Sequence, residues 1–265
     1  MLAAVLIDLL FITYKSTTMN NNLRFKLNLF FLMSLLLPLI GVSQTQNLIS
    51  TNRVFPKVDK VLEFEKALVT HAQKYHKGTA HWRVFDIQSG PDASGYHITE
   101  GPTSWEAEDV RGNLGNDHNV DWNKNVAIYL TEKSSTSYAV YQDSLSTVAL
   151  GDFSDKINIS HIYPKLGHGD DVINMIKKLK STWTATGVTV AVYFASSSGK
   201  PQYTLVTRYK QGLKERVPGF RKPFKESYEA ANGAGAYAQY QKDLAEHLDD
   251  SWSELLFMRA DLSSK

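Results

Sequence analysis

Cysteine is absent from the 265-residue sequence. Its absence excludes disulfide bonds, thiolate nucleophiles, thiolate metal ligands and a lipidated N-terminal cysteine. The sequence also lacks the GxSxG, HExxH and Walker patterns, which are typical of serine hydrolases, zinc proteases and P-loop nucleotide sites. Packing must therefore stabilise the fold, and no short motif identifies a reaction.

A large excess of charge of one sign is missing too. The formal net charge is +2. Lys15, Arg24 and Lys26 lie near the start of the chain with Asp8 as the one acidic residue among them, so residues 44–265 carry equal numbers of basic and acidic residues. Clustered Lys and Arg are the usual mark of nucleic-acid or anionic-membrane binding. We therefore expect neither partner, whereas 43% hydrophobic residues predict a globular core.

The first part of the chain has the pattern of a secretory signal peptide. From Met19, a polar and positive stretch precedes an apolar run over residues 27–40, and small residues end at Ser43. About 14 helical residues span only ~21 Å, too short for a ~30 Å hydrocarbon core. We interpret residues 19–43 as a cleaved signal peptide and residues 1–18 as an extension from a misplaced start codon. The protein is expected to be exported, to a bacterial periplasm or the cell exterior, without a membrane anchor.

An internal repeat organises the rest of the chain. Residues 53–58 resemble residues 161–166, and residues 95–99 resemble residues 202–206, with a spacing kept to within one residue. Further matches, in the same order, join residues 122–130 to 240–248 and residues 145–146 to 262–263. Such order predicts a duplication, with a first repeat over residues 47–149 and a second over residues 156–265.

Each repeat is expected to fold as strand, helix, strand, strand, helix and a short closing segment. In the second repeat, Gly187 should end the first helix, and residues 188–194 and 203–209 should form a hairpin. In the first repeat, a hairpin is expected over residues 80–88 and 96–100. Pro56 and Pro164 should end equivalent strands, since proline removes a ladder donor. The first helix of the first repeat should bury the face Val61, Leu62, Leu68, Ala72 and Tyr75.

This α+β pattern, with the Pro56-Lys57 and Pro164-Lys165 strand ends, resembles the ferredoxin-like fold of the dimeric α/β-barrel superfamily, including its NIPSNAP-like and antibiotic-biosynthesis-monooxygenase-like branches. Members usually pair two such units sheet to sheet. The resemblance implies that two tandem units in this chain form the barrel within one molecule. The superfamily includes cofactor-free oxygenases, haem-degrading enzymes and proteins of unknown role, so the resemblance does not choose a function.

The hairpin of the first repeat holds the candidate site. It carries His81, Arg83 and His97 where the second repeat has Val or Thr. The first interpretation is an edge hairpin whose polar residues face solvent, because ligand pockets are few per protein. If the hairpin lines a pocket instead, its buried ionisable groups need a partner: His97 would contact a ligand, Arg83 would bind an anion, and His81, Trp82 and Trp105 would add polar or aromatic walls.

The other histidines give weaker indications. His71 and His76 are five residues apart, a spacing that does not line one helix face, and we expect both to be solvated. His168 and Asp170 lie in a Gly-rich turn, where capping of a helix is the simpler role than metal binding. The sequence therefore predicts no metal site and no cofactor.

Two classes of function remain open at this point. The first is an exported module without catalysis, which binds a small apolar or aromatic molecule. The second is an oxygenase-like enzyme, cofactor-free or related to haem. Association of several chains into a homo-oligomer is left open as well.

Overall fold

The computed structural model describes residues 46–111, 114–195 and 197–265. Both the predicted extension, residues 1–18, and the predicted signal peptide, residues 19–43, lie outside the described residues. Within the described part of the chain, no helix is long and apolar enough to cross a membrane.

Each repeat forms a four-stranded unit with helices on one face. The first repeat contains β1 (Leu48–Pro56), α3 (Val61–Tyr75), β2 (Trp82–Ile87), β3 (Tyr96–Thr103), α4 (Trp105–Arg111), α5 (Asn116–Asp121) and β4 (Leu130–Tyr141). The second contains β5 (Lys156–Pro164), α6 (Gly169–Thr186), β6 (Val190–Ala195), β7 (Gln202–Arg208), α7 (Phe224–Asn232), α8 (Ala236–His247) and β8 (Leu248–Met258). Short helical turns join them: η1 (Val58–Lys60), η2 (Gly78–Ala80), η3 (Trp122–Val126), η4 (Ala127–Tyr129), η5 (Asp143–Leu145) and η6 (Gly212–Arg216).

The eight strands close into one antiparallel barrel in the order β1-β3-β2-β8-β5-β7-β6-β4. Each repeat contributes one sheet of ferredoxin-like order, β4-β1-β3-β2 and β8-β5-β7-β6. The sheets join where β2 pairs with β8 and where β4 pairs with β6. The predicted fold class is confirmed: two tandem ferredoxin-like units form a dimeric α/β barrel within one chain.

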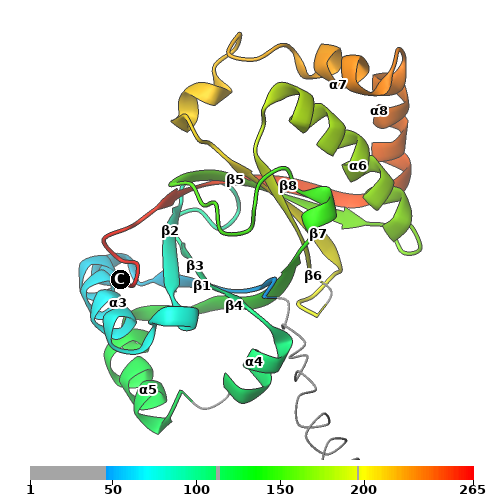
Figure 1. Ribbon diagram of the computed structural model, residues 1–265. Helices are drawn as coiled ribbons and strands as arrows, with labels where there is room; N and C mark the ends of the chain where they lie inside the picture. Colours follow the sequence, from blue (N-terminus) through cyan, green and yellow to red (C-terminus); the bar gives the residue numbers. More distant parts are fainter. Residues whose placement is uncertain (1–45, 112–113, 196) are drawn as a thin grey trace, which may run out of the picture. The chain divides into compact units, whose positions relative to one another are not determined.

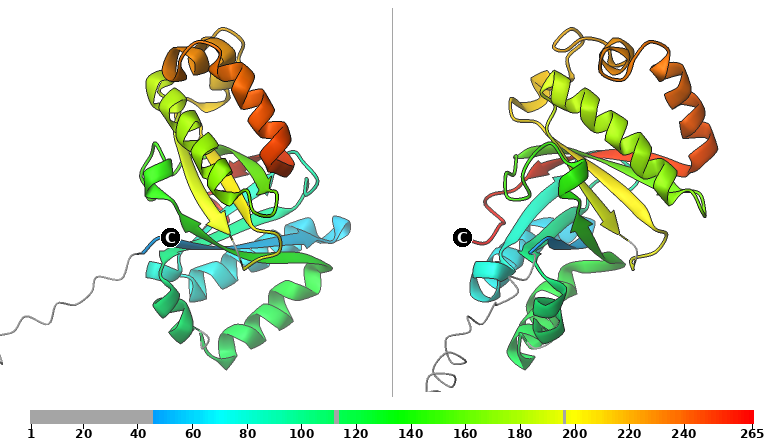
Figure 2. Two further views of the ribbon diagram at one scale, coloured as in Figure 1. Left: turned by 90° about the vertical axis from the view of Figure 1, so that its right-hand side faces the viewer. Right: turned by 45° about the vertical axis from the view of Figure 1, so that its right-hand side comes forward.

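The helices lie outside the barrel in two groups. In Figure 1, α3, α4 and α5 cover one side of the strand ring, and α6, α7 and α8 cover the opposite side; Figure 2 shows the same division from two other directions. One apolar cluster lies under each group, and smaller clusters inside the barrel include Phe85, Ile157, Ile159 and Leu256. The molecule therefore has three layers, with the barrel interior between two helix-covered cores.

Several local predictions are confirmed. Pro56 and Pro164 end β1 and β5 and occupy equivalent registers, opposite Leu130 of β4 and Leu248 of β8. Gly187 follows α6 in the left-handed conformation, with φ of 67°, which a residue without Cβ adopts at little cost. The strands β6 and β7 are antiparallel neighbours.

Two predictions about the first repeat are wrong. Leu62 is not part of the buried face of α3, because 77% of its surface is exposed; the buried residues are Phe64, Leu68, His71 and Ala72. The hairpin of β2 and β3 is not an edge hairpin, since β1 pairs with β3 and β8 pairs with β2. A closed barrel has no free edge there, and the inner face of this hairpin is enclosed.

The predicted closing segments are longer than expected. They include the full strands β4 and β8, of 12 and 11 residues. Residues 131–136 of β4 and 249–251 of β8 are polar and exposed, so the strands lack the regular apolar alternation by which a half-buried strand is recognised.

Candidate functional site

Alternate residues of the strands enclose a cavity of about 250 Å³ inside the barrel. Because side chains alternate across a strand, β1 contributes Ile49, Thr51 and Arg53, and β5 contributes Ile157, Ile159 and His161. The cavity lining is mixed. Apolar residues from both repeats form part of the wall, and two separate groups of polar side chains complete it.

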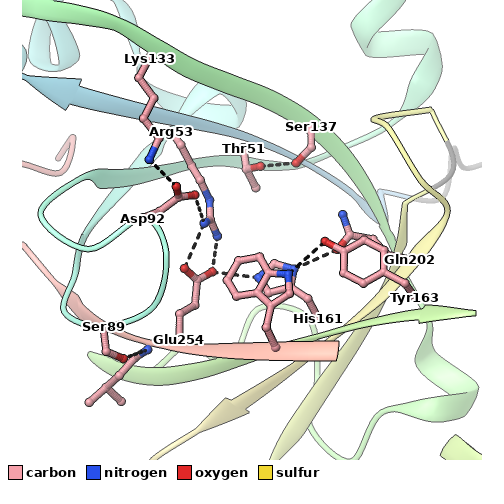
Figure 3. Close-up of polar contacts among 12 residues, drawn as sticks. Thr51, Arg53, Ser89, Asp92, Lys133, Ser137, His161, Tyr163, Gln202 and Glu254 are labelled. Atoms are coloured by element: carbon pink, nitrogen blue, oxygen red, sulfur yellow. Dashed lines mark hydrogen bonds and ion pairs between the residues drawn. The ribbon is translucent and has the colours of Figure 1, made fainter. Parts of the chain in front are cut away.

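The first polar group is a network of ion pairs between the two repeats (Figure 3). Arg53 of β1 donates to Glu254 of β8, with one contact of 3.0 Å between Nη1 and Oε2, and to Asp92 Oδ2 at 2.8 Å. His161 Nε2 lies 2.9 Å from Glu254 Oε1. Lys133 of β4 reaches the other oxygen of Asp92 at 2.8 Å. Glu254 is thus the shared partner of one residue from each repeat.

Burial gives this network its rigidity. The Glu254 side chain is fully buried and Arg53 nearly so. Burial alone lowers the pKa of Arg53, but hydrogen bonds and attraction from Glu254 and Asp92 outweigh it and raise the pKa above its usual value. Arg53 is therefore charged at any physiological pH.

His161 is held on both sides of its ring. Its Nδ1 lies 2.9 Å from Gln202 Oε1. The Trp252 indole stacks on the imidazole with centroids 3.9 Å apart and planes 16° apart. Trp252 also lines the cavity. This end of the cavity therefore presents an aromatic surface backed by fixed charges.

His97 lies inside the barrel, where its ring nitrogen Nδ1 is buried. It is 6% exposed, and its Nδ1 is buried and has no hydrogen-bond partner among the described residues. Burial, and then repulsion from Arg53 and His161, lowers its pKa well below the usual 6.5. The imidazole is therefore neutral at neutral pH, with one nitrogen left to bind something else.

The second polar group surrounds Phe153, in the segment between the repeats. The guanidinium carbons of Arg83 and Arg208 lie 3.8 Å and 4.9 Å from the centre of the Phe153 ring. Arg208 donates to the carbonyl of Ala149 and to Tyr193 Oη, both at 2.9 Å. In the described part of the chain, neither arginine has a carboxylate partner within 4.0 Å. This region of the wall is therefore positively charged.

Of the candidate residues, His97 is the one that lines the cavity. Arg83 lies nearby, on the same inner face: it is paired with Thr99, and Phe85 is paired with His97. Burial, together with repulsion from Arg208, lowers the pKa of Arg83. Arg83 and His97 therefore lie on the same face of the hairpin, on neighbouring strands.

The structure places the other three candidates elsewhere. Trp82 points to the opposite side of β2, into the core under α3, where its Nε1 donates to Glu100 at 2.6 Å. Trp105 is 47% exposed and contacts Tyr138. His81 lies before β2, 3.3 Å from Ser264 Oγ. They do not form one site with His97.

Sequence reasoning missed Arg53, His161 and Glu254. Arg53 and His161 occupy the same position in the matching segments of the two repeats. An ionisable residue at the same position of both predicted strands could have indicated a polar site inside the barrel. Glu254 gave no signal, because β8 was not expected to be a strand.

His71 and His76 are not solvated, contrary to expectation: they are 1% and 0% exposed. The prediction assumed one continuous helix, but α3 ends at Tyr75 and the chain leaves helical geometry at His76. Both side chains thus turn to the same place, beside His118. His168, just before α6, contacts Asp171 and His247 rather than Asp170. These two groups are the ones in the described residues that could hold a metal.

Comparisons with known proteins do not assign a family. No family model matches the chain, and no curated protein matches it. Among solved structures, an anthrone oxidase-like protein has 13% identity over 81% of this chain and 92% of its own, with a TM-score of 0.49. A mutant chlorite dismutase from Candidatus Nitrospira defluvii has 7% identity over 80% of this chain and 91% of its own, with a TM-score of 0.48. Such distant similarity carries no information about chemistry.

Proposed function

We propose that this protein binds a small aromatic molecule with a polar substituent inside its barrel. The observation that carries the proposal is His97, a buried residue that lines a cavity of about 250 Å³ and whose Nδ1 has no hydrogen-bond partner among the described residues. An unpaired buried polar group costs about 1–3 kcal/mol. A ligand hydroxyl, which can donate or accept, would remove that cost.

Size and charge narrow the class of ligand. A dry cavity of about 150 Å³ holds benzene, so about 250 Å³ suits a molecule of one or two rings. Trp252 and Phe153 offer aromatic surfaces. Arg83 and Arg208, which lack a carboxylate partner among the described residues, favour a ligand that also carries a negative charge. A hydroxylated aromatic carboxylate meets all of these conditions.

Binding of 4-hydroxybenzoate, phenol and benzoate, measured by calorimetry, tests the proposal. We expect 4-hydroxybenzoate to bind most tightly, and His97→Phe to weaken it by at least about tenfold, since a hydrogen bond of about 1.4 kcal/mol corresponds to that factor. Trp105→Ala, outside the cavity, is the control and should leave binding unchanged. No binding of any of the three probes would contradict the proposal.

The second candidate is an oxygenase-like enzyme that uses the same cavity. The neutral imidazole of His97 would accept a hydrogen bond from the hydroxyl of a bound phenol, and a phenol that has lost its proton is the electron-rich form that reacts with dioxygen. Oxygen consumption by the protein with a bound phenol, compared with its His97→Phe variant, tests this candidate.

Two further points are part of the proposal. Export through the signal peptide of residues 19–43 rests on the sequence pattern. Membership of the NIPSNAP-like or the antibiotic-biosynthesis-monooxygenase-like branch rests on element order.

A further inference from the structure

Three histidine side chains converge outside the barrel, in the layer between the first sheet and its helices. His71 lies on α3, His76 follows its last residue, and His118 lies on α5. His118 Nε2 is 3.2 Å from His71 Nε2 and 3.3 Å from His76 Nε2. The ligand atoms of the three residues lie within 4.8 Å of one another.

Carboxylates fix the orientation of two of these rings. His71 Nδ1 lies 2.7 Å from Asp121 Oδ2, and His76 Nδ1 lies 3.1 Å from Glu100 Oε2. An ionised carboxylate can only accept hydrogen bonds, so each Nδ1 carries the hydrogen and donates. In a neutral imidazole, the Nε2 atoms of His71 and His76 then present lone pairs.

The third ring completes a set of lone pairs that face one another. His118 Nδ1 lies 3.2 Å from Asn119 Oδ1, so it too donates, and its Nε2 faces the other two. A proton on His118 Nε2 could be shared with only one of the two neighbouring Nε2 atoms at a time. A metal cation at the point of convergence interacts with all three.

The distances agree with those of a zinc site. With Zn–N bonds of about 2.0–2.1 Å and tetrahedral angles, ligand nitrogens lie about 3.3–3.4 Å apart. The two contacts made by His118 Nε2, 3.2 Å and 3.3 Å, are close to this value. Histidine ligands of zinc usually donate their other N–H to a carboxylate or carbonyl, as His71 and His76 do here.

Packing holds the ligands in place before any ion binds. The His76 ring stacks on Trp82 with centroids 3.5 Å apart and planes 20° apart. Trp82 Nε1 also donates to Glu100 Oε2 at 2.6 Å, which positions the carboxylate for His76. His71 and His76 are buried whereas His118 is half-buried, so an ion can enter from the side of α5.

We propose that His71, His76 and His118 bind one Zn²⁺ ion through their Nε2 atoms, with a fourth position open to water. Three protein ligands and one open position are typical of catalytic rather than structural zinc sites. The site is separate from the cavity inside the barrel, because Trp82 and Glu100 lie on the outer face of the first sheet. It does not depend on the function proposed for that cavity.

The group of His168, Asp171 and His247 is the internal comparison. Its members are more exposed, with 36% and 47% of the His168 and Asp171 side chains accessible. The close contact there joins the Nδ1 atoms of the two histidines, 3.0 Å apart, and one carboxylate serves both. It therefore lacks the separate orienting carboxylates of the first group.

Metal analysis and calorimetry with Zn²⁺ on the untagged protein test the proposal. We expect one high-affinity zinc per chain, and Co²⁺ in its place should give the visible absorption of a tetrahedral ion. His118→Ala should weaken zinc binding by more than about 100-fold, since loss of an orienting carboxylate alone costs about 10–100-fold. Asp121→Asn should weaken zinc binding by about 10–100-fold, and His247→Ala should bind zinc with the affinity of the wild type.

Two further measurements separate binding from folding. His118 is half-buried, so His118→Ala should unfold at the same temperature as the metal-free wild type, and added zinc should raise that temperature in the wild type alone. His118→Cys, which restores a zinc ligand, should recover binding. Equal zinc affinity in the wild type and His118→Ala would overturn the proposal, as would loss of binding in His247→Ala or the absence of any zinc-dependent stabilisation.

Discussion

Glu254 is the residue on which the ion pairs inside the barrel depend. It accepts hydrogen bonds from Arg53 of one repeat and contacts His161 of the other, at a side chain with no exposed surface. Removal of one partner from a buried ion pair leaves an uncompensated charge, which costs about 3–5 kcal/mol.

We therefore predict that Glu254→Gln lowers the free energy of unfolding by about 3–5 kcal/mol. Asp249→Asn is the matched control: its ion pair with Lys200 lies at the surface, where such pairs contribute about 0–1 kcal/mol. Urea denaturation of the two variants and the wild type measures both effects. A loss below about 1 kcal/mol for Glu254→Gln would show that Asp92 suffices to balance Arg53.

His97 should behave in the opposite way. Because its Nδ1 has no partner among the described residues, His97→Leu removes an unsatisfied polar group and keeps an apolar side chain in the barrel. We predict a free energy of unfolding that is unchanged or higher by about 1 kcal/mol at pH 8. A loss of more than about 2 kcal/mol would indicate that His97 makes a hydrogen bond that stabilises the fold.

The same residue should make stability depend on pH. The pKa of His97 in the folded protein lies well below the usual 6.5, so below pH 6.5 the unfolded chain takes up a proton that the folded chain does not. Stability is then lost as the pH falls, by about 1.4 kcal/mol per pH unit for one such group. Between pH 6.5 and 5.5, where the unfolded imidazole goes from about half to mostly protonated, His97→Leu should lose less stability than the wild type by about 1 kcal/mol, measured by urea denaturation. An equal loss of stability in the wild type and in His97→Leu over this pH range would contradict the lowered pKa of His97.

At the level of single residues, the sequence singled out His97 and Arg83 because their repeat partners are Thr and Val. Both residues lie on the inner face of the barrel. His118 could not be joined to His71, because their contact depends on the packing of α5 against α3. Trp82 was placed on the wrong side, since neighbouring residues of a strand face opposite ways and the sequence does not say which side is the cavity.

At the scale of elements, each repeat donates a backbone hydrogen bond to a serine of the other repeat. Ser146, after β4 of the first repeat, accepts a hydrogen bond from the Val192 backbone N–H of β6 at 2.9 Å. Ser263, after β8 of the second, accepts one from Val84 of β2 at 3.0 Å. These serines belong to matching segments of the repeat, so the pairing is reciprocal.

We predict that Ser146→Ala and Ser263→Ala each lower the free energy of unfolding by about 1–3 kcal/mol, because each leaves a buried N–H group without an acceptor. Ser181→Ala on the exposed face of α6 is the control, with an expected effect within about 0.5 kcal/mol. Thermal unfolding should remain a single transition in every variant. Two separate unfolding transitions in Ser146→Ala or in Ser263→Ala would show that the repeats unfold independently.

The order of strands and helices was predictable because residues that begin and end these elements recur in both repeats. Strand β5 ends at a proline, α6 begins with two aspartates and ends at glycine, and the spacing recurs in the first repeat. Strand β4 was not predictable as a strand, because Glu132 and its neighbours up to Thr136 are exposed. Its position is determined by pairing with β1 and β6 rather than by its own pattern.

At the scale of the molecule, the duplication predicts that two sheets close into a barrel, but it does not predict which ionisable residues pair inside the barrel. The repeats place Arg53 and His161 at equivalent positions, opposite Ser135 of β4 and Trp252 of β8. Glu254 therefore corresponds to Ser137 of the first repeat. The acidic partner of Arg53 in the barrel wall comes from the second repeat, although the backbone is nearly symmetric.

This asymmetry determines how separated repeats should associate. A pair of first repeats would place two Arg53 side chains in one barrel with Asp92 but without Glu254, so each guanidinium would lose its fully buried partner, which costs about 3–5 kcal/mol. A pair of second repeats would bury two Glu254 carboxylates without Arg53. The mixed pair restores the network seen in the whole chain, so specificity arises from repulsion in the wrong pairs as well as attraction in the right one.

We accordingly predict that fragments 44–154 and 155–265, expressed together, form a 1:1 complex, whereas neither fragment alone forms a stable dimer. The cut falls after Phe153, so the first fragment keeps the loop whose carbonyl groups bind Arg208. Size-exclusion chromatography with light scattering measures the assemblies. Glu254→Gln in the second fragment should weaken the mixed complex by at least about 100-fold, the factor that corresponds to 3 kcal/mol, whereas Asp249→Asn should not. A stable homodimer of fragment 44–154 would show that barrel closure, rather than the buried ion pairs, decides which repeats associate.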